Sequence, residues 1–219
     1  MTQPAGETPV PTVSIPDIRD YERINAELVR ALDEGHPRVR LTGAEGQRLL
    51  ASGLTGAWQA VVEVEGRAGP ELAAALSAPG LTVVCRGPAA DGAGRSLRAG
   101  TLVILGDCGP ALGYGMEGGS FLAWGDAGTR AGLNQRGGVI VVRGTLGQLA
   151  GERQQGGLFF AYDDRLGPHA GRGASGGHLV RLRPGEGGPE GGDETESEVL
   201  RNLLAAILPW IAPGGQALL

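Results

Sequence analysis

Two segments of the chain carry the glycine spacing found in phosphate-binding loops. Residues 113–118 (Gly-Tyr-Gly-Met-Glu-Gly) and 171–176 (Gly-Arg-Gly-Ala-Ser-Gly) both spell G-x-G-x-x-G. In dinucleotide-binding folds this motif follows a strand and opens a helix, whose amino terminus binds the pyrophosphate. Here a strand-like pattern follows each motif, and the same glycines recur elsewhere at a fixed interval. We therefore expect both motifs to form turns rather than a nucleotide site.

Two aspartates have the spacing that paired-carboxylate chemistry would need. Asp107 and Asp126 each follow a glycine and lie 19 residues apart, and Asp164 has a nearly equivalent position. If their segments stack as neighbouring strands, the pair would lie roughly 5 Å apart, which suits a glycosidase-like or cation site. The alternative is that Gly-Asp begins a turn, where the carboxylate accepts hydrogen bonds from backbone amides. Thr145 fills the same place in the next repeat, which favours the turn.

The remaining reactive side chains form no catalytic or metal-binding pattern. His36, His169 and His178 include no i, i+4 pair and have no cysteine nearby. Cys85 and Cys108 either pair or stay free, and two cysteines are too few for an iron–sulfur cluster. No serine lies in a G-x-S-x-G elbow. We therefore predict no catalytic residue, no metal ligand and no cofactor-binding residue.

The glycines instead mark a repeat. The doublets at 118–119, 137–138, 156–157 and 176–177 are 19, 19 and 20 residues apart, and further columns keep this period. A fixed period near 20 residues predicts a solenoid in which each repeat is one coil. Stacked corners need positive φ and close backbone approach, which glycine supplies. We assign these glycines to structural turns: Gly94, Gly100, Gly113, Gly119, Gly132, Gly138, Gly151, Gly157, Gly171 and Gly177.

Each repeat also contains a short apolar strand. The strands align at 83–86, 102–105, 121–124, 140–143, 159–162 and 179–182. Because side chains alternate along a strand, the first and third columns should form the core of the stack. The second column, which starts with Val84 and Val103, is apolar as well. We expect the chain's own helices or another protein to cover this outward face.

The last strand column combines residue types that are common in the cores of interfaces. It includes Leu105, Trp124, Arg143 and Tyr162, and we predict a partner-binding surface there. The alternative is that a C-terminal helix covers these four side chains.

Helical patterns flank the repeat. Apolar residues from Ile18 to Leu32 have helical spacing, with Asp17 as a possible N-cap. Residues 60–80 are interpreted as a degenerate first coil, in which Pro70 to Ser77 form an alanine-rich piece in place of the usual turns. We predict an all-β, single-stranded right-handed β-helix of about 5–7 coils with flanking α-helices. The expected divisions are a flexible tail (1–16), a helix–strand lead-in (17–58), the repeats (59–183), a Gly/Pro linker (184–194) and a C-terminal helix (195–211).

Composition limits the possible partners. The chain has 219 residues and a net charge of −5, which gives no electrostatic reason to expect nucleic acid. No apolar run of 18 residues and no basic-then-apolar start occurs, so we expect neither a membrane span nor a signal peptide. We therefore expect a cytoplasmic protein without nucleic acid or membrane partners.

Residues 118–132 and their copies resemble the GXGXG domain, the C-terminal right-handed β-helix of the glutamate synthase large subunit. The lead-in from Ile24 to Leu54, with Gly43, Gly46 and Gln47 in a G-x-x-G-Q turn, is similar to the glutamate synthase branch. In that family the domain is not the catalytic part. Glutamine hydrolysis there uses an N-terminal cysteine, whereas this chain starts Met1-Thr2-Gln3, and flavin and the iron–sulfur cluster bind a barrel domain.

The resemblance implies a freestanding structural subunit, not catalytic alone, of a glutamate synthase-type oxidoreductase complex in nitrogen metabolism. Its expected partners are glutamine amidotransferase and flavin-dependent synthase subunits, or copies of itself. Two alternatives stay open. Similar repeats occur in the C subunits of formylmethanofuran dehydrogenase and of the formyltransferase/hydrolase complex. The second alternative is a stand-alone solenoid that binds a ligand or a polysaccharide through Asp107 and Asp126.

Overall fold

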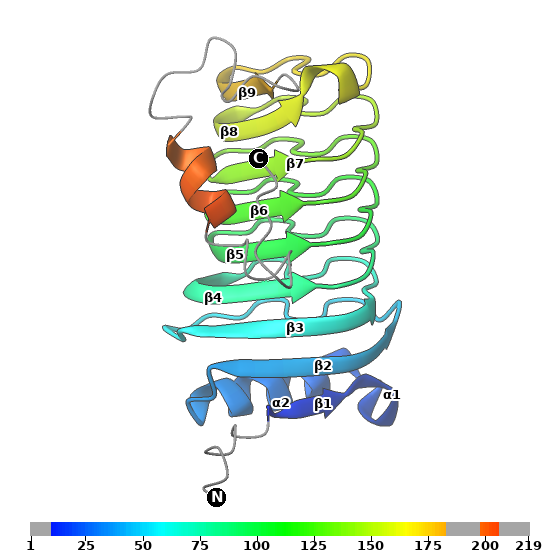
Figure 1. Ribbon diagram of the computed structural model, residues 1–219, viewed down its shortest axis with the longest axis vertical. Helices are drawn as coiled ribbons and strands as arrows, with labels where there is room; N and C mark the ends of the chain where they lie inside the picture. The colour runs from blue at the N-terminus through cyan, green and yellow to red at the C-terminus, as the bar shows by residue number, and fades with distance from the viewer. Residues whose placement is uncertain (1–9, 183–197, 206–219) are drawn as a thin grey trace, which may run out of the picture.

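The computed structural model describes residues 10–182 and 198–205 and shows a stack of coils (Figure 1). One parallel sheet contains all nine strands in sequence order, and successive coils form a right-handed β-helix of about seven turns. The predicted fold class is therefore confirmed. The strands are β1 (Thr12–Ser14), β2 (Arg38–Glu45), β3 (Ala60–Arg67), β4 (Ser77–Cys85), β5 (Ala99–Ile104), β6 (Ser120–Ala123), β7 (Val139–Val142), β8 (Gln155–Tyr162) and β9 (Gly176–Leu182).

The register of the sheet follows the 19-residue period through the middle of the stack. Phe121 pairs with Ile140, and Ile140 pairs with Phe159. All three side chains are fully buried inside the coils, as the column pattern predicts. The core becomes thinner at the β9 end, where Leu179 is only partly buried and Arg181 is exposed.

The stack begins earlier than the expected boundary at residue 59. Strand β2 belongs to the same sheet, since Val39 pairs with Val62, which pairs with Val83. These steps are 23 and 21 residues long instead of 19. The longer steps, and alanine in place of glycine in the turns, conceal the first coils in the sequence.

Each coil returns through a turn in which every second residue has positive φ. One such turn has φ values of 59° at Ala111, 62° at Gly113 and 62° at Gly115. The amide groups of Ala111 and Gly115 donate to carbonyls of the following coil, and that of Gly113 donates to the preceding coil. Neighbouring coils therefore provide hydrogen-bond acceptors for the backbone amides that this conformation points out of the coil.

This hydrogen-bond ladder lets residues other than glycine adopt the left-handed conformation. Glu71, Ala73 and Ala75 all have positive φ. The alanine-rich piece from Pro70 to Ser77 thus forms the same turn as the other coils, which corrects the expectation that it replaces the turn. The hydrogen bonds between coils offset the conformational cost of the left-handed region, which is roughly 1–2 kcal/mol per residue.

Helices cover the first coil. A short helix α1 (Ile15–Ile18) precedes α2 (Tyr21–Asp33), and the positive φ of Arg19 separates them. Asp20 caps α2 by accepting a hydrogen bond from the Arg23 amide at 3.0 Å, whereas Asp17, the expected cap, lies within α1. Within the range 1–16 expected to be a tail, residues 12–14 form β1, and residues 1–9 lie outside the described residues.

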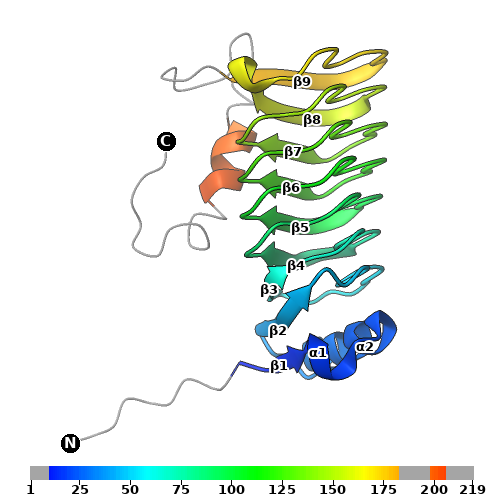
Figure 2. The same cartoon turned by 90° about the vertical axis from the view of Figure 1, so that its right-hand side faces the viewer.

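A further helix, at residues 198–205, lies against the outer face of the sheet, on the side away from the turns (Figure 2). It falls inside the range 195–211 expected to be helical. The expected linker (184–194) and residues 206–211 of that range lie outside the described residues. A short 3-10 helix, η1 (Asp163–Arg165), follows β8.

Candidate protein-interaction face

The outward face of the sheet carries a continuous apolar column, which we call the outer ladder. Its members pair in register from β4 to β9, and every one of them is buried. They are Val84, Val103, Leu122, Val141, Phe160 and Val180. This column forms a second apolar cluster, separate from the core inside the coils.

The helix at 198–205 supplies part of the cover that the sequence predicts for this face. Leu200, Leu203 and Leu204 pack against the outer ladder. The three leucines have i, i+3 and i+4 spacing, so they share one side of the helix. The helix stays partly exposed along this stripe, because all three leucines are only half-buried.

A second column, the edge rib, runs beside the outer ladder where the strands end. It consists of the predicted interface residues Leu105, Trp124, Arg143 and Tyr162. Leu105 and Trp124 pack against the outer ladder while remaining partly exposed. The structure thus brings these four residues together along one side of the stack, next to the apolar face.

Two arginines of this region lie over aromatic rings. The guanidinium carbon of Arg143 is 4.4 Å from the centroid of the Trp124 ring, and that of Arg165 is 4.9 Å from the Tyr162 ring. Arg165 also donates a hydrogen bond from Nη1 to the carbonyl of Arg143 at 2.6 Å. Within residues 10–182 and 198–205, neither guanidinium forms an ion pair with a carboxylate. Stacking fixes each planar group and leaves the N–H groups of Arg143, and those of Arg165 other than Nη1, available to a ligand.

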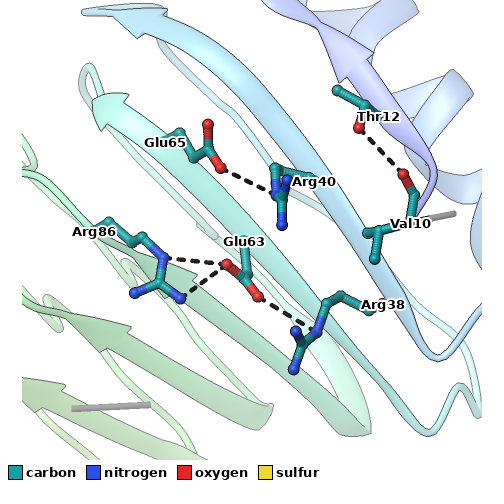
Figure 3. A network of polar contacts seen from close by, with 7 residues as sticks. All are labelled: Val10, Thr12, Arg38, Arg40, Glu63, Glu65 and Arg86. Carbon is teal, nitrogen blue, oxygen red and sulfur yellow. Dashed lines mark hydrogen bonds and ion pairs between the residues drawn. The ribbon is translucent and has the colours of Figure 1, made fainter. Parts of the chain in front are cut away.

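The same face is electrostatically different near its other end (Figure 3). Glu63 on β3 is 2% exposed and occupies the position that would continue the outer ladder, since it pairs in register with Val84. Arg86 binds Glu63 Oε2 with Nε at 3.1 Å and Nη2 at 3.0 Å, and Arg38 Nε lies 3.4 Å from Oε1. Arg40 and Glu65 form a further pair at 3.0 Å. Here three arginines share two glutamates, so the apolar face ends in a cluster of paired charges in which every arginine has a carboxylate partner.

The two aspartates of the acidic-pair hypothesis bind backbone amides. Asp107 Oδ1 accepts a hydrogen bond from the Asp126 amide at 2.9 Å, and Asp126 Oδ1 accepts one from the Thr145 amide at 2.7 Å. Each carboxylate therefore fixes the turn of the following coil, and both are exposed. Asp164 lies in η1, which breaks the series. These contacts favour the turn interpretation over a catalytic pair.

The other candidates from the sequence have structural roles. Both G-x-G-x-x-G segments lie in turns that precede a strand, β6 or β9, and Gly113, Gly115, Gly171 and Gly173 have positive φ. Cys85 and Cys108 are buried free thiols. Burial raises the pKa of both thiols, that of Cys108 to about 12. A thiol with such a pKa is not a nucleophile at neutral pH.

The histidines do not converge. His36 lies 3.5 Å from Glu34, His169 lies in the last turn, and His178 is on β9. The part of the chain that the structure describes holds no group of three or more His, Cys, Asp or Glu side chains placed to bind a metal ion. Among the same residues, no helix has the length and apolar character needed to cross a membrane.

Sequence reasoning missed several buried polar side chains. Gln135 and Gln154 are at most 1% exposed, and Gln154 Nε2 donates to Gln135 Oε1 at 3.3 Å inside the coils. They occupy one repeat position, 19 residues apart, where the preceding coil has Met116. Alignment of the repeats would have located them in the core. Glu63 could have been found as the charged exception in the outer ladder.

A family model described as the GXGXG motif matches residues 38–183. The match starts at the first residue of β2 and therefore includes the coils that the glycine spacing conceals. No curated protein and no solved structure matches the chain.

Proposed function

We propose that this chain, a member of the GXGXG motif family, is a structural component of a glutamate synthase-type assembly. The premise is that the GXGXG domain is found in the glutamate synthase large subunit. In this role the stack holds a glutamine amidotransferase and a flavin-dependent synthase against each other. The chemistry belongs to those partners, and the β-helix supplies a rigid surface.

The edge rib is the observation that supports this proposal. Trp124, Arg143 and Tyr162 lie in one line beside an apolar ladder, and each coil of the parallel sheet fixes one of them. Tryptophan, tyrosine and arginine supply most of the binding energy in protein interfaces, where they cluster in desolvated centres. A rigid parallel stack holds such side chains in place before binding, which reduces the entropy lost on association.

The chain's own reactive groups are engaged elsewhere, which agrees with a non-catalytic role. The carboxylates of Asp107 and Asp126 bind turn amides, and the Cys108 thiol is buried with its pKa raised to about 12.

Co-expression with an amidotransferase and a flavin-dependent synthase tests the proposal. We expect the three chains to elute together in size-exclusion chromatography, and Trp124→Ala to weaken the complex. Tyr114→Ala is the matched control, because this ring is stacked by Arg95 at 5.6 Å on the turn side of the coils. Flavin bound to the purified chain alone, or glutamine hydrolysis by it, would contradict a structural role.

A further inference from the structure

The arginines on the outer face divide into two groups. Near its N-terminal end, Arg38, Arg40 and Arg86 each face a glutamate. Near the other end, Arg143 and Arg165 lie over aromatic rings and form no ion pair within the described residues. On the turn side Arg95 pairs with Glu71 at 2.6 Å and Arg98 with Glu117 at 3.2 Å, whereas Arg153 and Arg172 form no ion pair within the described residues. Within the described residues, Arg143 and Arg165 are thus two arginines without a carboxylate partner where the predicted interface lies.

We infer that Arg143 and Arg165 receive carboxylates from an acidic, amphipathic segment of a partner polypeptide. This inference rests on the proposed assembly role and specifies the partner's chemistry. Apolar side chains of the segment would pack beside Trp124 and Tyr162, and its Asp or Glu side chains would accept hydrogen bonds from the two guanidinium groups.

The geometry favours a carboxylate over other acceptors. Each guanidinium is held flat by a ring, so its N–H groups keep the planar fork that matches the two oxygens of a carboxylate. The hydrogen bond from Arg165 to the Arg143 carbonyl fixes one guanidinium beside the residue that carries the other. Trp124 and Tyr162, the rings under the two guanidinium groups, belong to coils two steps apart, which is roughly 10 Å at about 4.8 Å per step. Two carboxylates two turns apart on a partner helix, at i and i+7, would have a similar separation, since the rise is about 1.5 Å per residue.

The flanking surface limits the length of such a segment. Towards β4 the three arginines around Glu63 are already engaged by Glu63 and Glu65, although three arginines against two glutamates leave the cluster one positive charge. Towards β9 Arg181 is paired with Asp163 at 2.6 Å. In the part of the chain that the structure describes, the arginines of the sheet's outer face that no carboxylate engages are therefore those of the β7 and β8 coils, and a short acidic segment is enough to pair with both.

Titration of the chain with its amidotransferase and synthase partners at increasing salt tests the inference. We expect Arg143→Glu and Arg165→Glu each to weaken association by roughly ten- to a hundredfold, because each loses a charge-assisted hydrogen bond. We also expect wild-type affinity to fall as salt rises, and this dependence to shrink in the double variant. Arg95→Glu, an exposed and ring-stacked arginine on the turn side, is the control and should bind like the wild type.

The possible outcomes distinguish this inference from the assembly proposal on which it rests. Failure of the wild-type chain to bind either partner at any salt concentration would overturn both. Wild-type binding that is insensitive to salt and to both charge reversals would overturn only the carboxylate inference. A lower unfolding temperature of isolated Arg143→Glu with unchanged association would also overturn only the carboxylate inference. The arginine would then interact with the chain's own acidic residues instead of a partner's.

Discussion

The side chain of Asn25 binds the backbone of Ala51 in place of a preceding coil. Its Oδ1 accepts a hydrogen bond from the Ala51 amide at 2.8 Å, and its Nδ2 donates to the Leu49 carbonyl at 2.8 Å. In later coils the equivalent amide donates to the coil before it, as Gly94 does to the Leu72 carbonyl at 2.8 Å. Helix α2 therefore ends the turn ladder, because its Asn25 side chain satisfies the Ala51 amide that the first coil would leave unpaired.

We expect Asn25→Ala to lower the free energy of unfolding by about 1–3 kcal/mol, because the part-buried Ala51 amide loses its acceptor, whereas the Leu49 carbonyl keeps its hydrogen bonds from Ser52. Urea denaturation measures this change. Asn25→Asp keeps the acceptor for the Ala51 amide and loses the donor to Leu49, so an intermediate loss is expected. Equal stability of Asn25→Ala and the wild type would show that α2 does not need this contact to cap the stack.

Gly92 and Gly94 provide a matched comparison within one turn, since their φ values are +69° and +65°. A Cβ at Gly94 would lie 2.8 Å from the Phe121 ring, whereas one at Gly92 has its nearest neighbour at 3.5 Å. We expect Gly92→Ala to cost about 1 kcal/mol of conformational energy. Gly94→Ala should cost a further ~1–3 kcal/mol of overpacking, in the same denaturation assay. Equal losses would mean that Phe121 moves aside without cost.

Stability should decrease at alkaline pH because of the buried thiols. Burial raises the pKa of Cys108 from an ordinary value of 9.0 to about 12, so the unfolded chain loses this proton first. Between pH 9 and 12 the free energy of unfolding should therefore fall, by up to ~1.4 kcal/mol per pH unit for each thiol. The sequence has no lysine whose titration would obscure the effect. Unfolding followed by circular dichroism at several pH values measures it.

Cys108→Ala should flatten this decline, and the double variant that also carries Cys85→Ala should flatten it further, since burial raises the pKa of Cys85 too. A slope that persists unchanged in the double variant would refute the assignment to the thiols.

Arg86→Ala should destabilise the chain more than Glu63→Met does. Loss of Arg86 removes two hydrogen bonds from a carboxylate that is 2% exposed and leaves it with Arg38 Nε at 3.4 Å, and a buried charge that loses a partner costs up to roughly 3 kcal/mol. Glu63→Met removes that charge and extends the apolar outer ladder by one coil, and its arginine partners are partly exposed to water. Thermal unfolding of the two single variants and the double variant gives the comparison. The reverse order would show that the ion pair, rather than its burial cost, dominates.

The periodic part of this protein could be predicted from its sequence. Repeated glycine columns and apolar strand columns fix the coil length, the strand positions, the inner core and the composition of the edge rib, because every coil has the same neighbours. The sequence also marks the outer ladder as a surface that needs a cover. These features follow from local spacing alone.

The tertiary structure decided what the period does not encode. Non-glycine residues such as Glu71 and Ala73 hold positive φ because their amides donate hydrogen bonds to carbonyls of neighbouring coils. The first coils therefore lack the glycines that would reveal them. Asn25 caps the stack through contacts with residues 24 and 26 positions away. The burial of Glu63 depends in the same way on packing between separate strands. Such contacts leave no repeating trace in the chain, because each occurs once and joins segments that only folding brings together.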